Sequence, residues 1–284
     1  MKPVIEVKSL RKSYGSLEVV KGISLVIDSG EIFAILGPNG AGKTTTVEIL
    51  EGFRAADAGE ISVLNTDPAV KGSAGLAWRN RIGIVLQSTQ DTAELTVREA
   101  ISHFASYYSN PREVDEVIAL VGLEEKADNR ARTLSGGQRR RLDVALGIIG
   151  RPELLFLDEP TTGFDPEARR AFWVLIKKLR SEGTTILLTT HYLDEAEALA
   201  DRVAVMNHGE ILEVSTPALL GGRANSKATV TWRDAGVAKS EETDSPTEFV
   251  QRLSAQFGGE VPELGIHRPT LEDIYISMIG ATHE

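Results

Sequence analysis

The sequence predicts an α/β protein built around a mostly parallel β-sheet that helices cover on both faces. Short, near-continuous apolar runs recur along the chain, and segments with helical periodicity separate several of them. Such runs are typical of strands buried on both sides, and they occur at Ile32–Leu36, Ile82–Leu86, Leu154–Leu157, Ile186–Thr189 and Val203–Met206. Two further strands, at Ile5–Ser9 and Val19–Ile27, precede this alternating part of the chain.

Composition excludes several other classes of protein. The 284 residues are 42% hydrophobic and 25% charged, which is ordinary for a folded, water-soluble core. No apolar run approaches the ~20 residues of a membrane-spanning helix, and the N-terminus has no apolar segment of a secretory signal. Because cysteine is absent, disulfides, thiolate zinc sites and cysteine nucleophiles are excluded. A net charge of −10 also disfavours nucleic acid as a partner. Taken together, these exclusions lead us to expect a soluble, cytoplasmic protein.

Three helices have recognisable beginnings. Thr96 and Glu99 have the spacing of a capping box, which predicts a helix running towards Tyr108. Asp165-Pro166 combines an N-cap residue with a first-turn proline, ahead of an apolar pattern with helical spacing. Tyr192–Asp201 is rich in Ala, Leu and Glu and predicts a short third helix.

The composition changes after Leu220, where Gly221-Gly222 interrupts the chain. We therefore predict a first domain at residues 1–221 and a small α+β accessory domain at residues 222–284. Residues 234–247 are polar and acidic, and the pattern then resumes weakly. The elements expected in this part are a strand near Ala228–Trp232 and helices around Glu248–Phe257 and Leu271–Ile279.

A glycine-rich loop follows the Ile32–Leu36 strand and matches the pattern G-x-x-x-x-G-K-[ST]. Glycines let backbone N–H groups curl around phosphate oxygens, and the helix expected at Thr44–Glu51 adds the partial positive charge of its N-terminus. The Lys43 ammonium can reach β- and γ-phosphates, and the Thr44 hydroxyl can ligate Mg²⁺. We expect nucleotide to be bound by Gly37, Pro38, Asn39, Gly40, Ala41, Gly42, Lys43, Thr44 and Thr45.

Two carboxylates, Asp158 and Glu159, end the apolar run Leu154–Leu157. The carboxyl ends of buried parallel strands line the crevice where α/β sheets bind ligands. Asp158 is therefore expected to bind Mg²⁺, in part through water. Because neighbouring residues of a strand point to opposite sides, Glu159 is expected to do a different job, namely to orient and polarise the attacking water.

Leu134-Ser135-Gly136-Gly137-Gln138 lies twenty residues before Asp158, just ahead of a helix-forming segment. With this motif the sequence resembles the ATP-binding cassette (ABC) ATPases, whose signature is LSGGQ. The resemblance implies a P-loop fold with an N-terminal antiparallel β subdomain and a helical subdomain at about residues 94–140. It also implies that Ser135, Gly136, Gly137 and Gln138 bind the γ-phosphate held by a second subunit, in a head-to-tail dimer that encloses two ATP molecules.

The same resemblance assigns roles to four more positions. Tyr14 is expected to stack on adenine. Gln87, which follows the Ile82–Leu86 strand, is expected to sense Mg²⁺ and to couple the site to a transmembrane partner. Asp165 resembles the residue of the D-loop that crosses the dimer interface, although the preceding Phe164 stands where leucine is commoner. His191, which follows the Ile186–Thr189 strand, resembles the histidine that contacts the γ-phosphate.

These features predict the ATP-hydrolysing motor of an ABC transporter, attached to the inner face of the cell membrane by a separate permease and paired with itself or a paralogous ATPase. The segment His267–Tyr275 resembles the C-terminal extension of bacterial exporter ATPases of the daunorubicin-resistance type. This favours export of a drug, lipid or polysaccharide over import. Three alternatives stay open: an importer ATPase, a soluble cassette ATPase such as one serving iron–sulfur assembly, and a regulatory module that binds nucleotide without hydrolysing it.

Overall fold

The computed structural model describes residues 2–85 and 94–280 and divides the chain into two compact units, Met1–Val214 and Ser215–Glu284. The sequence places the boundary at residue 221, whereas the structure places it earlier, between Val214 and Ser215. The reason is that the short helix η3 (Leu220–Asn225) packs against α9 (Leu271–Gly280) of the second unit. A Cβ atom on Gly221 would lie only 2.4 Å from Cγ2 of Ile274, so the two segments approach closely.

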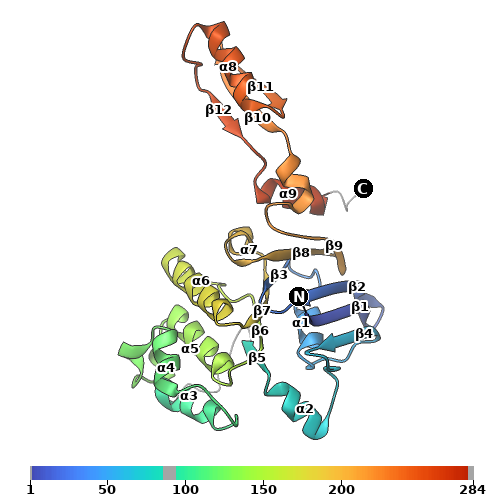
Figure 1. Ribbon diagram of the computed structural model, residues 1–284, viewed down its shortest axis with the longest axis vertical. Coiled ribbons are helices and arrows are strands. Elements are labelled where there is room, and N and C mark those ends of the chain that lie inside the picture. The colour runs from blue at the N-terminus through green and yellow to red at the C-terminus, as the bar shows by residue number, and fades with distance from the viewer. Residues whose placement is uncertain (1, 86–93, 281–284) are drawn as a thin grey trace. The chain divides into compact units, whose positions relative to one another are not determined.

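A six-stranded sheet with the order β5-β6-β7-β3-β8-β9 forms the centre of the first unit (Figure 1). The pairs β5–β6, β6–β7, β7–β3 and β3–β8 are parallel. Every residue of β3, β6 and β7 is buried, which confirms the parallel, covered sheet that the apolar runs predict. The strands are β3 (Ile32–Leu36), β5 (Ile82–Val85), β6 (Leu154–Asp158), β7 (Thr185–Thr190), β8 (Arg202–Asn207) and β9 (Glu210–Ser215).

A second, antiparallel sheet of the same unit has the order β2-β1-β4. Its strands are β1 (Pro3–Tyr14), β2 (Leu17–Asp28) and β4 (Ala58–Val63). The first two are longer than the sequence predicts, and β4 escaped prediction because most of its side chains are exposed or only partly buried. One apolar cluster contains side chains of this sheet, of α1 (Lys43–Leu50) and of the parallel sheet, among them Ile5, Val47, Phe33 and Phe156.

The helices of the first unit begin where the sequence indicates in two clear cases. A capping box between Thr96 and Glu99 opens α3 (Val97–Ala105), and Asp165 caps α6 (Pro166–Ser181). Helices α3, α4 and α5 pack on one another and gather together in Figure 1. The remaining elements are α2 (Gly72–Arg79), α4 (Val114–Leu120), α5 (Gly136–Ile148), α7 (Leu193–Leu199), η1 (Glu124–Lys126) and η2 (Ala131–Thr133).

The second unit is a small α+β structure with its own core. Its antiparallel sheet has the order β11-β10-β12, and Val230, Phe249, Leu253 and Val261 form an apolar cluster within it. Strand β11 lies in the acidic segment for which the sequence predicted no element, because almost all of its side chains are exposed. The elements are β10 (Ala228–Asp234), β11 (Val237–Thr243), α8 (Pro246–Phe257), β12 (Gly265–His267) and α9.

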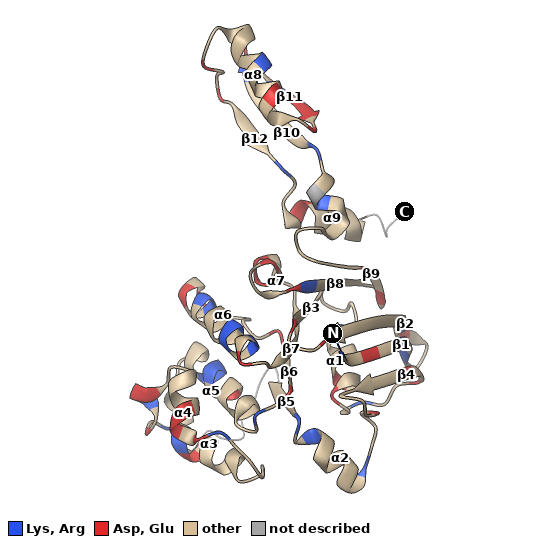
Figure 2. Ribbon diagram, in the orientation of Figure 1, with Lys and Arg blue, Asp and Glu red and all other residues tan. Residues whose placement is uncertain are grey.

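Within residues 2–85 and 94–280, no helix combines the length and the apolar character that a membrane span requires. Figure 2 shows acidic and basic residues interspersed over the helices α3 to α6 of the first unit.

Candidate functional site

The glycine-rich loop joins β3 to α1, and the surrounding chain requires its glycines. A Cβ atom on Gly37 would lie 2.2 Å from the carbonyl oxygen of Met206. Gly42 has a φ of 101°, and its Cβ would lie 2.7 Å from the carbonyl oxygen of Val19. Other side chains are excluded at both positions because of these close approaches and, at Gly42, because of the left-handed backbone.

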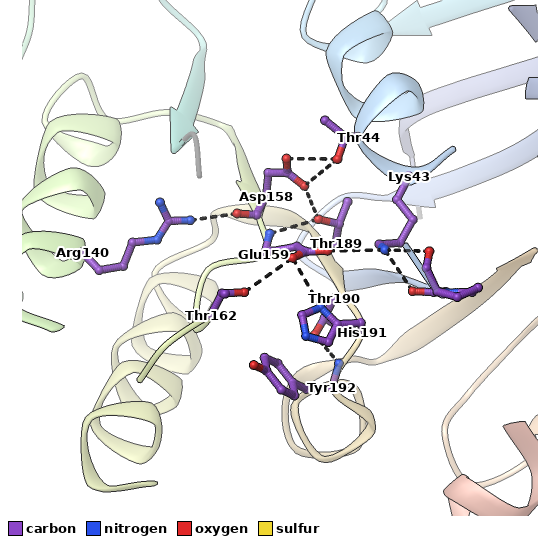
Figure 3. Close-up of polar contacts among 12 residues, drawn as sticks. Lys43, Thr44, Arg140, Asp158, Glu159, Thr162, Thr189, Thr190, His191 and Tyr192 are labelled. Atoms are coloured by element: carbon purple, nitrogen blue, oxygen red, sulfur yellow. Dashed lines mark hydrogen bonds and ion pairs between the residues drawn. The ribbon is translucent and has the colours of Figure 1, made fainter. Parts of the chain in front are cut away.

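Lys43 lies under this loop, with its side chain only 4% exposed. Its Nζ donates hydrogen bonds to the carbonyl oxygens of Gly37 at 2.9 Å and of Pro38 at 3.2 Å. The same ammonium lies 3.4 Å from Oε1 of Glu159 (Figure 3). One buried positive charge therefore stands between the loop that surrounds the expected phosphates and the acidic pair at the end of β6.

Thr44 and Asp158 come together from different elements, as expected for two ligands of one cation. The Thr44 hydroxyl donates to the Asp158 carboxylate, at 3.3 Å from Oδ2, and Thr189 of β7 donates to the same carboxylate. A hydroxyl beside a single carboxylate is a small set of hard oxygen ligands. Such a set fits Mg²⁺, which keeps several waters and takes further ligands from nucleotide phosphates.

Glu159 lies between two candidate phosphate-binding side chains. Its Oε2 is 3.3 Å from Nδ1 of His191, and its Oε1 faces Lys43. Its backbone N–H donates to the Thr189 hydroxyl at 3.0 Å, and its φ of 43° is left-handed. The strand alternation that the sequence assigns to Glu159 is therefore wrong, because β6 ends at Asp158. The turn that follows, rather than the pleat of the strand, aims the two carboxylates at different partners.

Arg140 contacts the same turn from the signature helix α5, and the sequence analysis missed it. Its Nη2 donates to the Asp158 carbonyl oxygen at 2.9 Å, and its Nε donates to that of Pro160 at 3.0 Å. Burial lowers the pKa of the Arg140 guanidinium, and nearby carboxylates, including Asp158, oppose that shift. In sequence it is the middle of three arginines, so only its burial distinguishes it from its neighbours.

Glu51, at the end of α1, is a second residue that sequence reasoning missed. Burial raises the pKa of its carboxyl to about 8, and the negative charges of Asp158 and Glu48 add to the shift. The carboxyl is thus largely protonated at neutral pH. It therefore adds little negative charge next to Asp158, the candidate Mg²⁺ ligand. A glutamate at a helix end normally lies at the surface, so the sequence carries no signal for this role.

The signature motif opens α5 and faces outward. The Ser135 hydroxyl accepts from the Gln138 N–H at 3.3 Å, and the Gln138 side chain accepts from the Ser135 N–H at 3.0 Å. This capping box was not anticipated from the sequence. A pocket of about 400 Å³ lies here, lined by Ser135–Gln138, by Gly163–Asp165 and by the first turns of α6. The structure therefore brings the signature residues and Asp165 to one surface.

Tyr14, at the end of β1, is 41% exposed, with Lys12 Nζ 5.7 Å and the Arg54 guanidinium 5.4 Å from its ring centroid. Its stacking on adenine stays a prediction. Gln87 lies outside the residues that the structure describes.

Comparison with known proteins identifies the family. The family described as ABC transporter matches residues 20–162. The Nod factor export ATP-binding protein I of Burkholderia lata is 36% identical, over 97% of this chain and 97% of its own length. The protein of that name from Rhizobium sp. (strain N33) is 43% identical, over 76% of this chain and 72% of its own. The chain belongs to the ABC transporter ATPases.

A solved member supports the same assignment for the fold. CbiO1 from Clostridium perfringens, described as part of the ABC transporter complex CbiONQ, superimposes with a TM-score of 0.70 at 30% identity. The match covers 77% of this chain and 90% of CbiO1. This ABC ATPase is therefore a nucleotide-binding and ATP-hydrolysing subunit of a transporter, and the P-loop ABC fold predicted from the sequence is confirmed.

Proposed function

We propose that this ABC ATPase works as a head-to-tail dimer that encloses two ATP molecules and drives export through a separate transmembrane permease. The observation that carries the dimer is a separation within one chain. Lys43, Asp158, Glu159 and His191 converge at the ends of the central strands, whereas the signature lines a different pocket with the Asp165 turn. A second copy supplies the signature that each phosphate loop lacks.

The proposed phosphate contacts follow from charge and donor geometry. Lys43 and the loop N–H groups hold negative charge on the β- and γ-phosphates. Thr44 and Asp158, with Gln87 as the further expected ligand, hold Mg²⁺, which neutralises charge that develops on the phosphate oxygens. Tyr14 stacks on adenine. The Ser135 hydroxyl and the N-terminal N–H groups of α5 meet the γ-phosphate of the opposite copy.

Glu159 and His191 are proposed to act on the attacking water. The Glu159 carboxylate accepts a proton from, or orients, a water placed in line with the γ-phosphate, and its left-handed backbone aims it into the site. His191, 3.3 Å from that carboxylate, holds the water and the γ-phosphate in register. Hydrolysis removes the γ-phosphate that joins the two copies, and the dimer then opens.

Export is favoured by relatives along the whole chain. The Nod factor export protein of Burkholderia lata aligns with 97% of this chain, including the second unit. We infer an exported drug, lipid or polysaccharide, and a location on the inner face of the cell membrane through the permease.

Replacing Glu159 by Gln tests the proposed chemistry. Glu159→Gln is expected to bind ATP, to lower hydrolysis by about 100-fold or more, and to trap an ATP-bound dimer on size-exclusion chromatography. Glu153→Gln is the matched control, because Glu153 pairs with Arg81 just before the other end of β6. This variant should leave hydrolysis unchanged. Brisk turnover by Glu159→Gln, or an ATP-bound monomer, contradicts the proposal.

A further inference from the structure

Helices α6 and α7 pack on each other, and Figure 2 shows basic residues along α6 and acidic residues on α7. One contact between them reaches the catalytic region. Arg169 Nη1, at the end of the first turn of α6, lies 2.8 Å from Oδ2 of Asp194. Its guanidinium carbon also lies 4.5 Å from the centroid of the Tyr192 ring.

Tyr192 in turn contacts His191, its neighbour in the chain. The two ring centroids are 4.1 Å apart, with an interplanar angle of 40°. Planar guanidinium suits this place, because it can bond a carboxylate at its edge while its face covers an aromatic ring. The Arg169 side chain is 20% exposed and that of Asp194 is 56% exposed, so the guanidinium is partly shielded from water while the carboxylate is solvated. We call Arg169, Tyr192 and Asp194 the α6–α7 clasp.

The turn of α6 that carries this clasp also borders the signature pocket. Ala168, the residue before Arg169, lines that pocket, and its Cβ lies 3.5 Å from the place of a Cβ on Gly137. Asp165 caps the same turn by accepting from the Ala168 N–H at 2.8 Å. A phosphate that enters the pocket from a second subunit therefore contacts the first turn of α6. Arg169, which lies on that turn, contacts Tyr192.

A buried acid, Glu195, follows the clasp residue Asp194 in the chain. Glu195 of α7 has no exposed surface, and burial raises the pKa of its carboxyl. The hydroxyls of Thr190 and Thr161, the indole of Trp173 and the charge of Arg169 oppose that shift. They come from the end of β7, from the turn after β6 and from α6.

We propose that Arg169 and Tyr192 are positioning residues that link the signature pocket of a subunit to the His191 of that same subunit. When the nucleotide of the opposite copy occupies the pocket, it fixes the position of the first turns of α6. Through the contacts of the clasp, the position of His191 is then fixed as well. Hydrolysis at one site then depends on nucleotide at the other. The inference rests on the role proposed above for His191.

Removal of the clasp is expected to slow catalysis without weakening nucleotide binding. Arg169→Ala and Tyr192→Ala should each lower kcat for ATP about tenfold, with KM within about twofold of the wild-type value. Tyr192→Phe keeps the ring and should keep wild-type kcat. In a His191→Ala background, Arg169→Ala should lower kcat no further, because the clasp acts through His191.

Arg180→Ala is the matched control, because Arg180 pairs with Asp201 at 2.7 Å from the far end of α6. It should leave kcat unchanged at a similar thermal midpoint. Should Arg169→Ala unfold, Tyr192→Ala carries the test, since it leaves the Arg169–Asp194 pair in place.

The inference is overturned if Arg169→Ala or Tyr192→Ala changes KM instead of kcat, or if either leaves kcat at the wild-type level while His191→Ala abolishes turnover. It is also overturned if Arg180→Ala lowers kcat as much as Arg169→Ala. Wild-type turnover by His191→Ala rejects the proposed role of His191 itself, and the clasp with it.

Discussion

Two glycine-containing motifs of this ABC ATPase lie at the starts of helices, and their glycines meet different structural requirements. In the phosphate loop, a Cβ on Gly37 would overlap the Met206 carbonyl oxygen, and Gly42 has a positive φ beside Val19. In the signature, no described atom lies within 4 Å of a Cβ on Gly136, and one on Gly137 would make only ordinary contact with Ala168.

The two sets of glycines indicate where each motif meets its neighbours. The phosphate loop needs glycine because its own chain closes tightly around it. The signature glycines lie in a helix whose backbone and described neighbours accept alanine. Their lack of side chains becomes useful only when a ligand approaches from outside the chain, which supports the proposed dimer.

The largest effect is expected from paired Gly→Ala substitutions on folding. Gly37→Ala should lower the free energy of unfolding by about 3 kcal/mol, because the new methyl group meets backbone that cannot move aside. Gly136→Ala should raise that free energy by about 0.5 kcal/mol, because alanine restricts the unfolded chain and fits the helical backbone. Urea unfolding of the nucleotide-free protein measures both. Equal losses at the two glycines would remove the contrast.

The next effect separates binding from hydrolysis. Ser135→Arg fills the signature pocket and should lower hydrolysis about 100-fold while the Kd of the monomer for ATP stays within about twofold. Lys43→Ala should raise that Kd at least about tenfold, because it removes a charged donor from the phosphates. Fluorescent-nucleotide titration and phosphate release measure the two quantities. A Ser135→Arg protein with normal turnover would contradict the division of labour between the loops.

The smallest effect concerns the two capping boxes. Ser135→Ala and Thr96→Ala each remove a side-chain acceptor for the first turn of a helix, so each should cost about 1 kcal/mol of stability. Only Ser135→Ala should also slow hydrolysis, because only Ser135 faces the proposed second nucleotide. Thermal unfolding and phosphate release on the same samples distinguish the two roles. If both variants slow hydrolysis equally, Ser135 acts through the helix alone.

Local signals predicted a large part of the fold. The apolar runs indicated the buried strands β3, β6 and β7, and Asp165-Pro166 indicated the start of α6, because burial and capping leave a mark on contiguous residues. Strands β4 and β11 left no such mark, since their side chains are mostly exposed or only partly buried. The partner of β4 is also distant in sequence, because β4 pairs with β1.

The candidate site divides in the same way. Its glycine loop, acidic pair and signature are contiguous motifs, so the sequence alone indicated a nucleotide site and the residue types that serve it. Arg140 and Glu51 carry no such pattern, because what distinguishes them is burial next to Asp158.

The amino-acid sequence alone indicates the chemistry of this protein through a phosphate loop, a pair of carboxylates and a signature. Each of these motifs can be recognised because its residues are neighbours in the chain. Tertiary structure decided how these parts meet. The strand order that places β7 between β6 and β3 brings Glu159 to both Lys43 and His191, and the turn after β6, not the pleat, aims it there. Contacts between residues so far apart in the chain depend on how the strands pack, and no local pattern encodes that.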